Sequence, residues 1–239
     1  MAFQETPIRV DHDGGNYEGL LVTDTADPAP RHGVLVCHAW AGRSELEDRR
    51  ARELAEAGFA ALSIDLFGIG IRGDTKEECS ALIEPFVNDR ERLRQHLTRW
   101  LETLAEQDGV DAERLSVIGF CFGGLCALDL ARSEADLHAA ISFHGLLGAP
   151  GGDKEPDYRI KARVLALHGW DDPMGTPEQV VAFGREMSAA GADWQLHAYG
   201  NTQHAFTNPN ANDHDFGTVY DAKTERRSMQ AMLNLLREA

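Results

Sequence analysis

The sequence predicts a protein of the α/β class, with a mostly parallel, doubly wound sheet that follows an antiparallel N-terminal hairpin. Short apolar runs rich in β-branched residues alternate with longer segments of helical periodicity, which is typical of parallel strands connected by helices. Two runs near the N-terminus are joined by a glycine-containing turn, which favours antiparallel pairing. The 239 residues, 43% of them hydrophobic, can form one large core, so we expect a single domain over residues 1–239 without a separate lid domain.

Strands are expected over four apolar runs in the first half of the chain, at residues 8–12, 17–22, 33–38 and 60–65. The first two are the hairpin strands, joined by Asp-Gly-Gly-Asn at residues 13–16. Helices are expected where a Ser or Thr is followed three positions later by Glu, because this capping box satisfies N–H groups at a helix start. Two such starts occur, at Ser44 and at Thr75.

The same alternation continues through the second half of the chain. A long helix is expected from about Pro85 to Glu106, with leucines at helical spacing. Further strands are expected at residues 115–119, 138–143, 164–168 and 194–199. Helices are expected over 122–132 and 222–238, and another begins at Thr176, with Pro177 at its first position.

The composition excludes several classes of partner. The chain has 39 acidic and 23 basic residues, a formal net charge of −16, which argues against nucleic acids and anionic membranes because both are bound through clustered Lys and Arg. No apolar run reaches the roughly 18 residues of a membrane-spanning helix, and the first residues lack the pattern of a signal peptide. The four cysteines form neither a disulfide framework nor a CxxC metal pattern, so we expect a cytoplasmic location.

The sharpest local motif is Gly-Phe-Cys-Phe-Gly-Gly at residues 119–124, between a predicted strand and a predicted helix. Glycines two before and two after the central Cys121 allow a sharp strand-to-helix turn that holds the central side chain exposed, as in a nucleophile elbow. The helix N-terminus favours the thiolate form of such a cysteine. The alternative is a small buried cysteine in a tight turn.

Two later segments supply partners for this cysteine. Asp171 and Asp172 follow the strand at 164–168, and His204 follows the strand at 194–199. The order nucleophile, acid, histidine is that of the α/β-hydrolase fold, in which the histidine acts as general base and the acid orients it. Taken singly, the aspartates could be turn residues and His204 a loop histidine. The coincidence of all three favours a catalytic triad.

These residues belong to a wider resemblance. The sequence resembles the dienelactone hydrolases (carboxymethylenebutenolidases) of the α/β-hydrolase superfamily over essentially the whole chain. The shared motifs lie at residues 34–38, 64–68, 119–124, 169–172 and 204–206. The cysteine in the elbow is the specific part, since most of the superfamily uses serine. The resemblance implies Cys121 as nucleophile, His204 as base and Asp172 as the acid, with Asp171 as the alternative.

An oxyanion hole needs two backbone N–H groups directed at the developing negative charge. One is expected from Phe122, directly after the nucleophile, and the resemblance implies Trp40 for the other. We place His38, His144 and Phe206 in the substrate pocket, because strand ends are where α/β sheets bind ligands. His38, His144 and His168, each at the end of a predicted strand, could also bind zinc, but no ligand spacing supports it, so we expect neither a metal nor a cofactor.

Two positions depart from the family. Ala39 stands where the dienelactone hydrolases have a glutamate that interacts with the resting cysteine. Asn208 stands where they have an arginine that binds the substrate carboxylate. Arg72 could supply a cation from another loop, although a solvated surface arginine is the simpler interpretation. We therefore expect a neutral substrate, or one whose charge lies away from this position.

We accordingly expect a hydrolase of small ester or lactone substrates that acts through a Cys-His-Asp triad and a thioester intermediate. One alternative is a redox-reactive protein that uses a low-pKa Cys121 without ester turnover. Another is a member of the family that binds a small ligand without catalysis.

Overall fold

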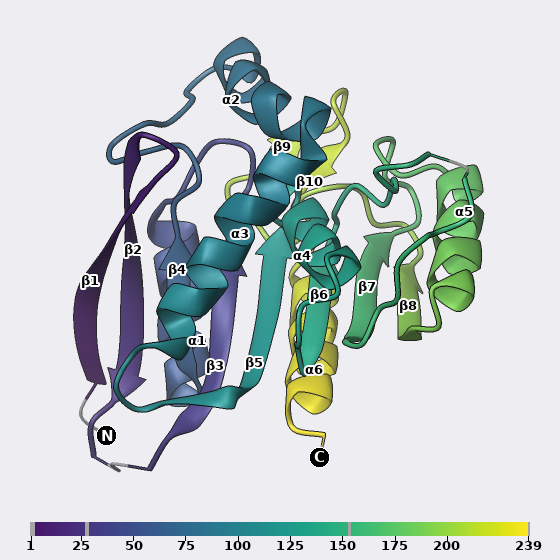
Figure 1. Cartoon of the computed structure of the whole chain (residues 1–239). Helices are drawn as coiled ribbons and strands as arrows, with labels where there is room; N and C mark the ends of the chain where they lie inside the picture. The colour runs from purple at the N-terminus through teal and green to yellow at the C-terminus, as the bar shows by residue number, and fades with distance from the viewer. Residues whose placement is uncertain (1–2, 27–28, 153, 239) are drawn as a thin grey trace. The chain divides into compact units, whose positions relative to one another are not determined.

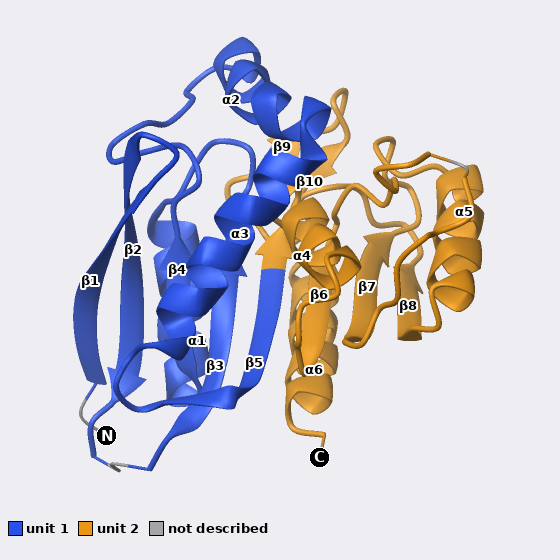
Figure 2. Cartoon of the chain, viewed as in Figure 1, with its two compact units in different colours: residues 1–118 blue, residues 119–239 orange. Residues whose placement is uncertain are grey.

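The structure is a computed structural model that describes residues 3–26, 29–152 and 154–238 (Figure 1). The chain divides into two compact units, residues 1–118 and 119–239, each of which has strands and helices of its own (Figure 2). The single domain expected over residues 1–239 stays a prediction, and the two units are described in turn.

Unit 1 combines the predicted hairpin with parallel strands. It contains β1 (Phe3–His12), β2 (Gly15–Asp24), β3 (Arg31–Cys37), α1 (Glu45–Glu56), β4 (Ala60–Ile64), α2 (Lys76–Asn88), α3 (Arg90–Ala105) and most of β5 (Val110–Phe120). The strands lie in the order β1-β2-β4-β3-β5. β1 pairs with β2 and β2 with β4 in antiparallel fashion, whereas β3 and β4 are parallel. Helices α1 and α3 cover opposite faces of these strands (Figure 1).

The hairpin turn has the geometry that its residues favour. Asp13 and Gly14 have φ of 48° and 73°, and a type I′ turn requires positive φ at both central residues. Val10 lies opposite Tyr17 across the hairpin, and both side chains are buried. The antiparallel start expected from the sequence is therefore confirmed.

Two helix starts of unit 1 follow the capping prediction, but the predicted start of the third helix was wrong. Both expected capping boxes form, at Ser44 for α1 and at Thr75 for α2. The helix expected from about Pro85 begins later, at Arg90, because residues 85–88 belong to the end of α2. The Asp89 side chain accepts the N–H of Arg92 and caps α3, so the helical pattern is interrupted at this residue.

Unit 2 is built on three parallel strands in the order β6-β7-β8. Its elements are α4 (Phe122–Arg132), β6 (Ala139–Phe143), β7 (Arg163–Gly169), α5 (Pro177–Ala189), β8 (Asp193–Tyr199), β9 (Asn212–Asp213), β10 (Thr218–Val219) and α6 (Ala222–Leu236). Helices α4 and α6 both pack against β6, and α5 packs against β8. Every residue of β6 is buried, as its continuous apolar sequence predicts.

The parallel strands of unit 2 bring their C-terminal ends to one edge, where α/β sheets place their functional loops. His144 follows β6, the segment 170–176 follows β7, and the segment 200–217 follows β8. Cys121 joins this edge through its backbone N–H, which donates to the carbonyl oxygen of Phe143 over 3.0 Å. Among the described residues, no helix has both the length and the apolar character needed to cross a membrane.

Candidate functional site: a cysteine, a histidine and an aspartate in unit 2

Cys121 occupies a strained turn between β5 and α4. Its φ of 56° and ψ of −115° lie in a region that side-chain-bearing residues rarely adopt and that is found mainly at functional sites. The preceding glycine is required, because a Cβ at Gly119 would lie 2.0 Å from the carbonyl oxygen of Gly123. The elbow expected from the sequence motif thus has a steric basis, and its cysteine is half-buried.

Asp172 and His204 form a buried pair. Asp172 Oδ2 lies 2.7 Å from His204 Nδ1, and the two side chains are 1% and 2% exposed, respectively. The other carboxylate oxygen accepts the N–H of Met174 over 2.8 Å, so the carboxylate is held on both sides. Asp171 is exposed, which distinguishes the two aspartates that the sequence left open.

Two backbone hydrogen bonds, one through its N–H and one through its carbonyl, hold His204 in place. Its N–H donates to the carbonyl oxygen of Gly217, and its own carbonyl accepts the N–H of Val219, each over 2.9 Å. These bonds tie the histidine to β10, which pairs with β9 in a short hairpin. The sequence did not predict this hairpin, because strands of two residues carry too little hydrophobic pattern to be recognised.

The charge environment of His204 favours its protonated form. Burial by itself lowers the pKa of this imidazole, but Coulombic attraction to Cys121 and the hydrogen bond to Asp172 outweigh it, so the pKa is raised well above the ordinary value. His204 Nε2 is buried. Cys121 raises the pKa of this imidazole through its charge and also through a side-chain hydrogen bond.

His144 and Phe206, both expected near a substrate, lie beside this histidine. The His144 ring centroid is 5.0 Å from that of His204 and 4.9 Å from that of Phe206. His144 is 2% exposed and Phe206 0% exposed. Phe122, expected to donate to an oxyanion, is the first residue of α4, where backbone N–H groups point out of the helix end.

His38 and Trp40, the other two predicted site residues, belong to unit 1. His38 is fully buried, with Nδ1 2.6 Å from the carbonyl oxygen of Ala39 and Nε2 accepting the N–H of Leu66 over 3.1 Å. Burial lowers its pKa to about 4. Trp40 is half-buried in the turn after β3. The roles expected for these two residues stay predictions.

Two residues considered for binding an anionic substrate have local structural partners. The Asn208 side chain accepts the N–H of Asn210 over 3.0 Å, which stabilises the loop after His204. Arg72 is exposed and donates to the carbonyl oxygen of Arg43 over 2.8 Å. Across the described residues, no group of three or more His, Cys, Asp or Glu side chains could hold a metal ion.

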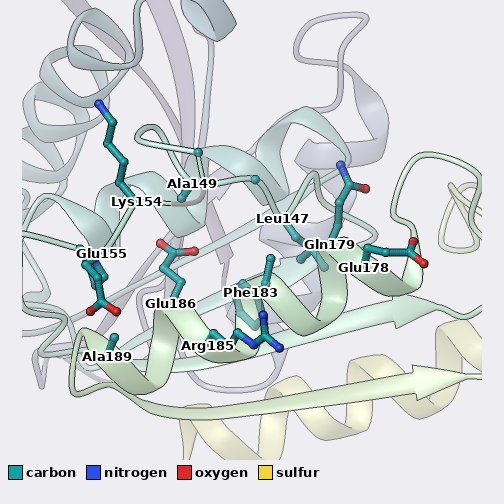
Figure 3. A pocket seen from close by; sticks show the side chains of 14 residues that line it. Leu147, Ala149, Lys154, Glu155, Glu178, Gln179, Phe183, Arg185, Glu186 and Ala189 are labelled. Carbon is teal, nitrogen blue, oxygen red and sulfur yellow. The ribbon is translucent and has the colours of Figure 1, made fainter.

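A concave region away from these residues lies over α5 and the loop after β6 (Figure 3). This hollow of about 650 Å³ is lined by 14 residues, none of which belongs to the Asp172–His204 pair. Its lining carries charges of both signs, from Lys154, Arg185, Glu155, Glu178 and Glu186. Glu186 is neutralised by Arg132, which donates to its two oxygens over 2.6 and 2.7 Å. The hollow therefore presents no concentrated charge to a ligand.

Comparison with known proteins places the chain in a family. Residues 17–239 match the sequence profile of the dienelactone hydrolase family. The chain belongs to this family. A solved dienelactone hydrolase-like promiscuous phosphotriesterase from metagenomic libraries is 35% identical, with a TM-score of 0.91 over 99% of this chain and 98% of that one. The fold class expected from the sequence is thereby confirmed.

Other known proteins also match in sequence. An uncharacterised protein of Caenorhabditis elegans is 37% identical over 150 residues, which are 62% of this chain and 94% of that protein. A Yersinia pestis protein provisionally named carboxymethylenebutenolidase is 29% identical over 196 residues, 77% of this chain and 69% of that protein. The protein is thus a member of a hydrolase family.

Proposed function

We propose that this dienelactone hydrolase family member cleaves small carboxylic esters or lactones, with Cys121 as nucleophile, His204 as acid and base, and Asp172 as the orienting acid. One observation carries the proposal: the Asp172–His204 pair, joined over 2.7 Å, lies in the electrostatic field of a cysteine on a strained strand-to-helix turn. Such a constellation is recognised by the geometry and roles of its members.

The acylation step uses the raised pKa of His204. Because the imidazolium is favoured beside Cys121, the cysteine is available as thiolate, the form of the thiol that attacks carbonyl carbon. A carbon–sulfur bond forms and the carbonyl electron pair moves to oxygen. The N–H of Phe122 at the start of α4 is a proposed donor to this oxyanion. The intermediate collapses to a thioester, and the leaving alkoxide takes the proton from His204.

The deacylation step reverses the role of the same histidine. Neutral His204 removes a proton from water, and the hydroxide attacks the thioester carbonyl. The carbon–sulfur bond breaks, releasing the carboxylic acid and regenerating the thiolate beside an imidazolium. Asp172 keeps the Nδ1–H of His204 directed toward itself, so that Nε2 is the atom that exchanges protons with the reactants.

The part of the proposed substrate that would lie against Asn208 carries no charge. An amide has no net charge, and the oxygen of this one is already bonded to the N–H of Asn210. A carboxylate could pair only with the uncharged NH2 group of this amide, so it would gain less here than from an arginine, which adds a positive charge and two parallel hydrogen bonds. Uncharged aryl esters and simple lactones are the substrates to test first.

Intact-protein mass spectrometry with p-nitrophenyl acetate tests the nucleophile. We expect one acetyl adduct in the native protein and its loss in Cys121→Ala. Cys126→Ala is the matched control, since this cysteine lies on α4, the helix that follows Cys121, and is fully buried. It should retain both the adduct and the turnover. An adduct and full turnover that persist in Cys121→Ala would contradict the proposal.

A further inference from the structure

His144 has both ring nitrogens engaged by the protein, and one of them contacts the proposed nucleophile. Nδ1 accepts the backbone N–H of Cys121 over 3.1 Å, and Nε2 lies 2.8 Å from Thr207 Oγ1. A backbone N–H can only donate, so Nδ1 must keep its lone pair and the proton of the neutral ring must be on Nε2. Thr207 Oγ1 is therefore the acceptor of that Nε2–H group. The contacts on either side of the ring select one neutral tautomer.

The first of these contacts lies at the most strained point of the elbow. The N–H of Cys121 is shared between Nδ1 of His144 and the carbonyl oxygen of Phe143, at 3.1 and 3.0 Å. A residue with φ of 56° and ψ of −115° keeps that conformation only where its surroundings determine it strongly. The side chain of His144 supplies one of these constraints, because it accepts the backbone N–H of the residue that carries the thiol.

The same ring also lies against the proposed base. The His144 and His204 rings meet at an interplanar angle of 64° with centroids 5.0 Å apart. A positive charge on His144 at this distance would oppose the imidazolium of His204, which Cys121 and Asp172 otherwise favour. A ring whose Nδ1 must accept a hydrogen bond can carry no such charge without losing that bond.

We propose that His144 is a positioning residue that fixes the backbone of Cys121 and presents an uncharged ring to His204. Thr207 secures this role by holding the Nε2–H tautomer. The inference rests on the proposed function, since Cys121 and His204 are the nucleophile and base whose geometry it serves. It gives His144 a role other than the direct substrate contact that its position at a strand end indicated.

Substitutions at residue 144 separate the acceptor from the bulk of the side chain. His144→Asn keeps an acceptor oxygen at the place of Nδ1, and asparagine tolerates the φ of 39° found here. His144→Leu branches at the same atom but has no acceptor. We expect the leucine variant to lose about 10²-fold in kcat with KM little changed, and the asparagine variant to recover most of that loss.

Because leucine at this φ could destabilise the chain, a second pair of variants leaves residue 144 intact. Thr207→Val removes the acceptor for Nε2–H at nearly the same volume, whereas Thr207→Ser keeps a hydroxyl. We expect kcat to fall by about 10-fold in the valine variant and to stay near the native value in the serine variant. Equal kcat values in the native protein, His144→Leu and Thr207→Val would overturn the proposal.

The tautomer can be read without any turnover. In protein labelled with ¹⁵N-histidine, we expect the His144 resonances to report a neutral ring with its proton on Nε2, at pH 7 and in Cys121→Ala as well. A proton on Nδ1, or a charged ring, would overturn the proposal. If instead Cys121→Ala stays fully active, the proposed function fails, and the tautomer in that variant still decides whether His144 is held as inferred.

Discussion

His38 in unit 1 and His204 in unit 2 are buried to nearly the same extent but favour opposite charge states. His38 is 0% exposed and His204 is 1% exposed. Burial disfavours an imidazolium in both cases, and in His38 it lowers the pKa to about 4. In His204 the same cost is outweighed by its partners Cys121 and Asp172, and the pKa is raised.

The difference comes from the chemistry of the contacts. His38 meets a backbone carbonyl at Ala39 and a backbone N–H at Leu66, both uncharged. His204 meets a carboxylate at Asp172 and the side chain of Cys121. The exposed fraction of a histidine is therefore a poor guide to its charge. The ionisable groups around the ring determine that charge. In this protein the histidine whose protonated form is favoured is the one beside the strained cysteine.

The largest expected effect comes from removing the carboxylate beside His204. Asp172→Asn keeps the shape but no longer favours the imidazolium or the Nδ1–H tautomer, so the pKa of His204 should fall. We expect kcat for ester hydrolysis to decrease by about 10³- to 10⁴-fold. Steady-state kinetics with p-nitrophenyl acetate measure the change.

Asp171→Asn is the matched control for this substitution, because its side chain is exposed next to the same turn. It should alter kcat by less than about 2-fold, as surface substitutions usually have small effects. If the two variants lost activity equally, the contrast between His38 and His204 would not originate in the Asp172 contact.

A second buried charged side chain of unit 2, that of Arg132, tests whether charged partners also stabilise the fold. Arg132 is buried, with Glu186 at 2.6 Å and Asp129 at 3.2 Å. Arg132→Met leaves these carboxylates without their cation, so we expect the free energy of unfolding to fall by about 3–5 kcal/mol. Urea denaturation measures it. Arg226→Met, at an exposed position of α6, is the control and should change it by less than about 0.5 kcal/mol.

His38 should make the protein sensitive to acid. Its pKa is lowered in the folded chain, so the unfolded chain binds the proton more readily between about pH 6.5 and 4. The stability that neutral His38 contributes is present above pH 6.5 and is lost as the pH falls through this window, by roughly 3 kcal/mol.

His38→Gln keeps an amide that can accept the N–H of Leu66 but takes up no proton in this range. Urea denaturation at pH 7 and pH 4.5 should show a smaller decrease in stability for this variant than for the native chain. An equal decrease in both proteins would show that His38 does not cause the acid sensitivity.

The smallest expected effect concerns the threonine N-caps that occur in both units. Thr75 and Thr176 cap α2 and α5 in the same way, each accepting an N–H from the third helical residue. Substituting either by alanine should lower the free energy of unfolding by about 1 kcal/mol. Serine at the same positions should preserve the cap. Neither alanine variant should change the pKa of His204, which NMR titration can verify.

The predictable parts of this structure are those that depend on residues close together in the sequence. A capping box needs only residues i and i+3, and the predicted boxes at Ser44 and Thr75 are confirmed. The elbow at residues 119–124 was likewise recognisable, because its glycines and its cysteine are neighbours in the chain. The predicted boundary at Pro85 was wrong, since a single Asp89 cap separates two helices whose apolar patterns run together.

The sequence by itself determined the fold class, the hairpin and the candidates Cys121, Asp172 and His204, because local steric and hydrogen-bonding demands can be read from neighbouring residues. Only the tertiary structure decided which of two adjacent aspartates faces His204, and that His144 accepts the N–H of Cys121. Hydrogen bonds and charges act over a few ångströms. Which groups come that close, across 32 and 23 residues of chain in these two contacts, depends on how strands and loops pack.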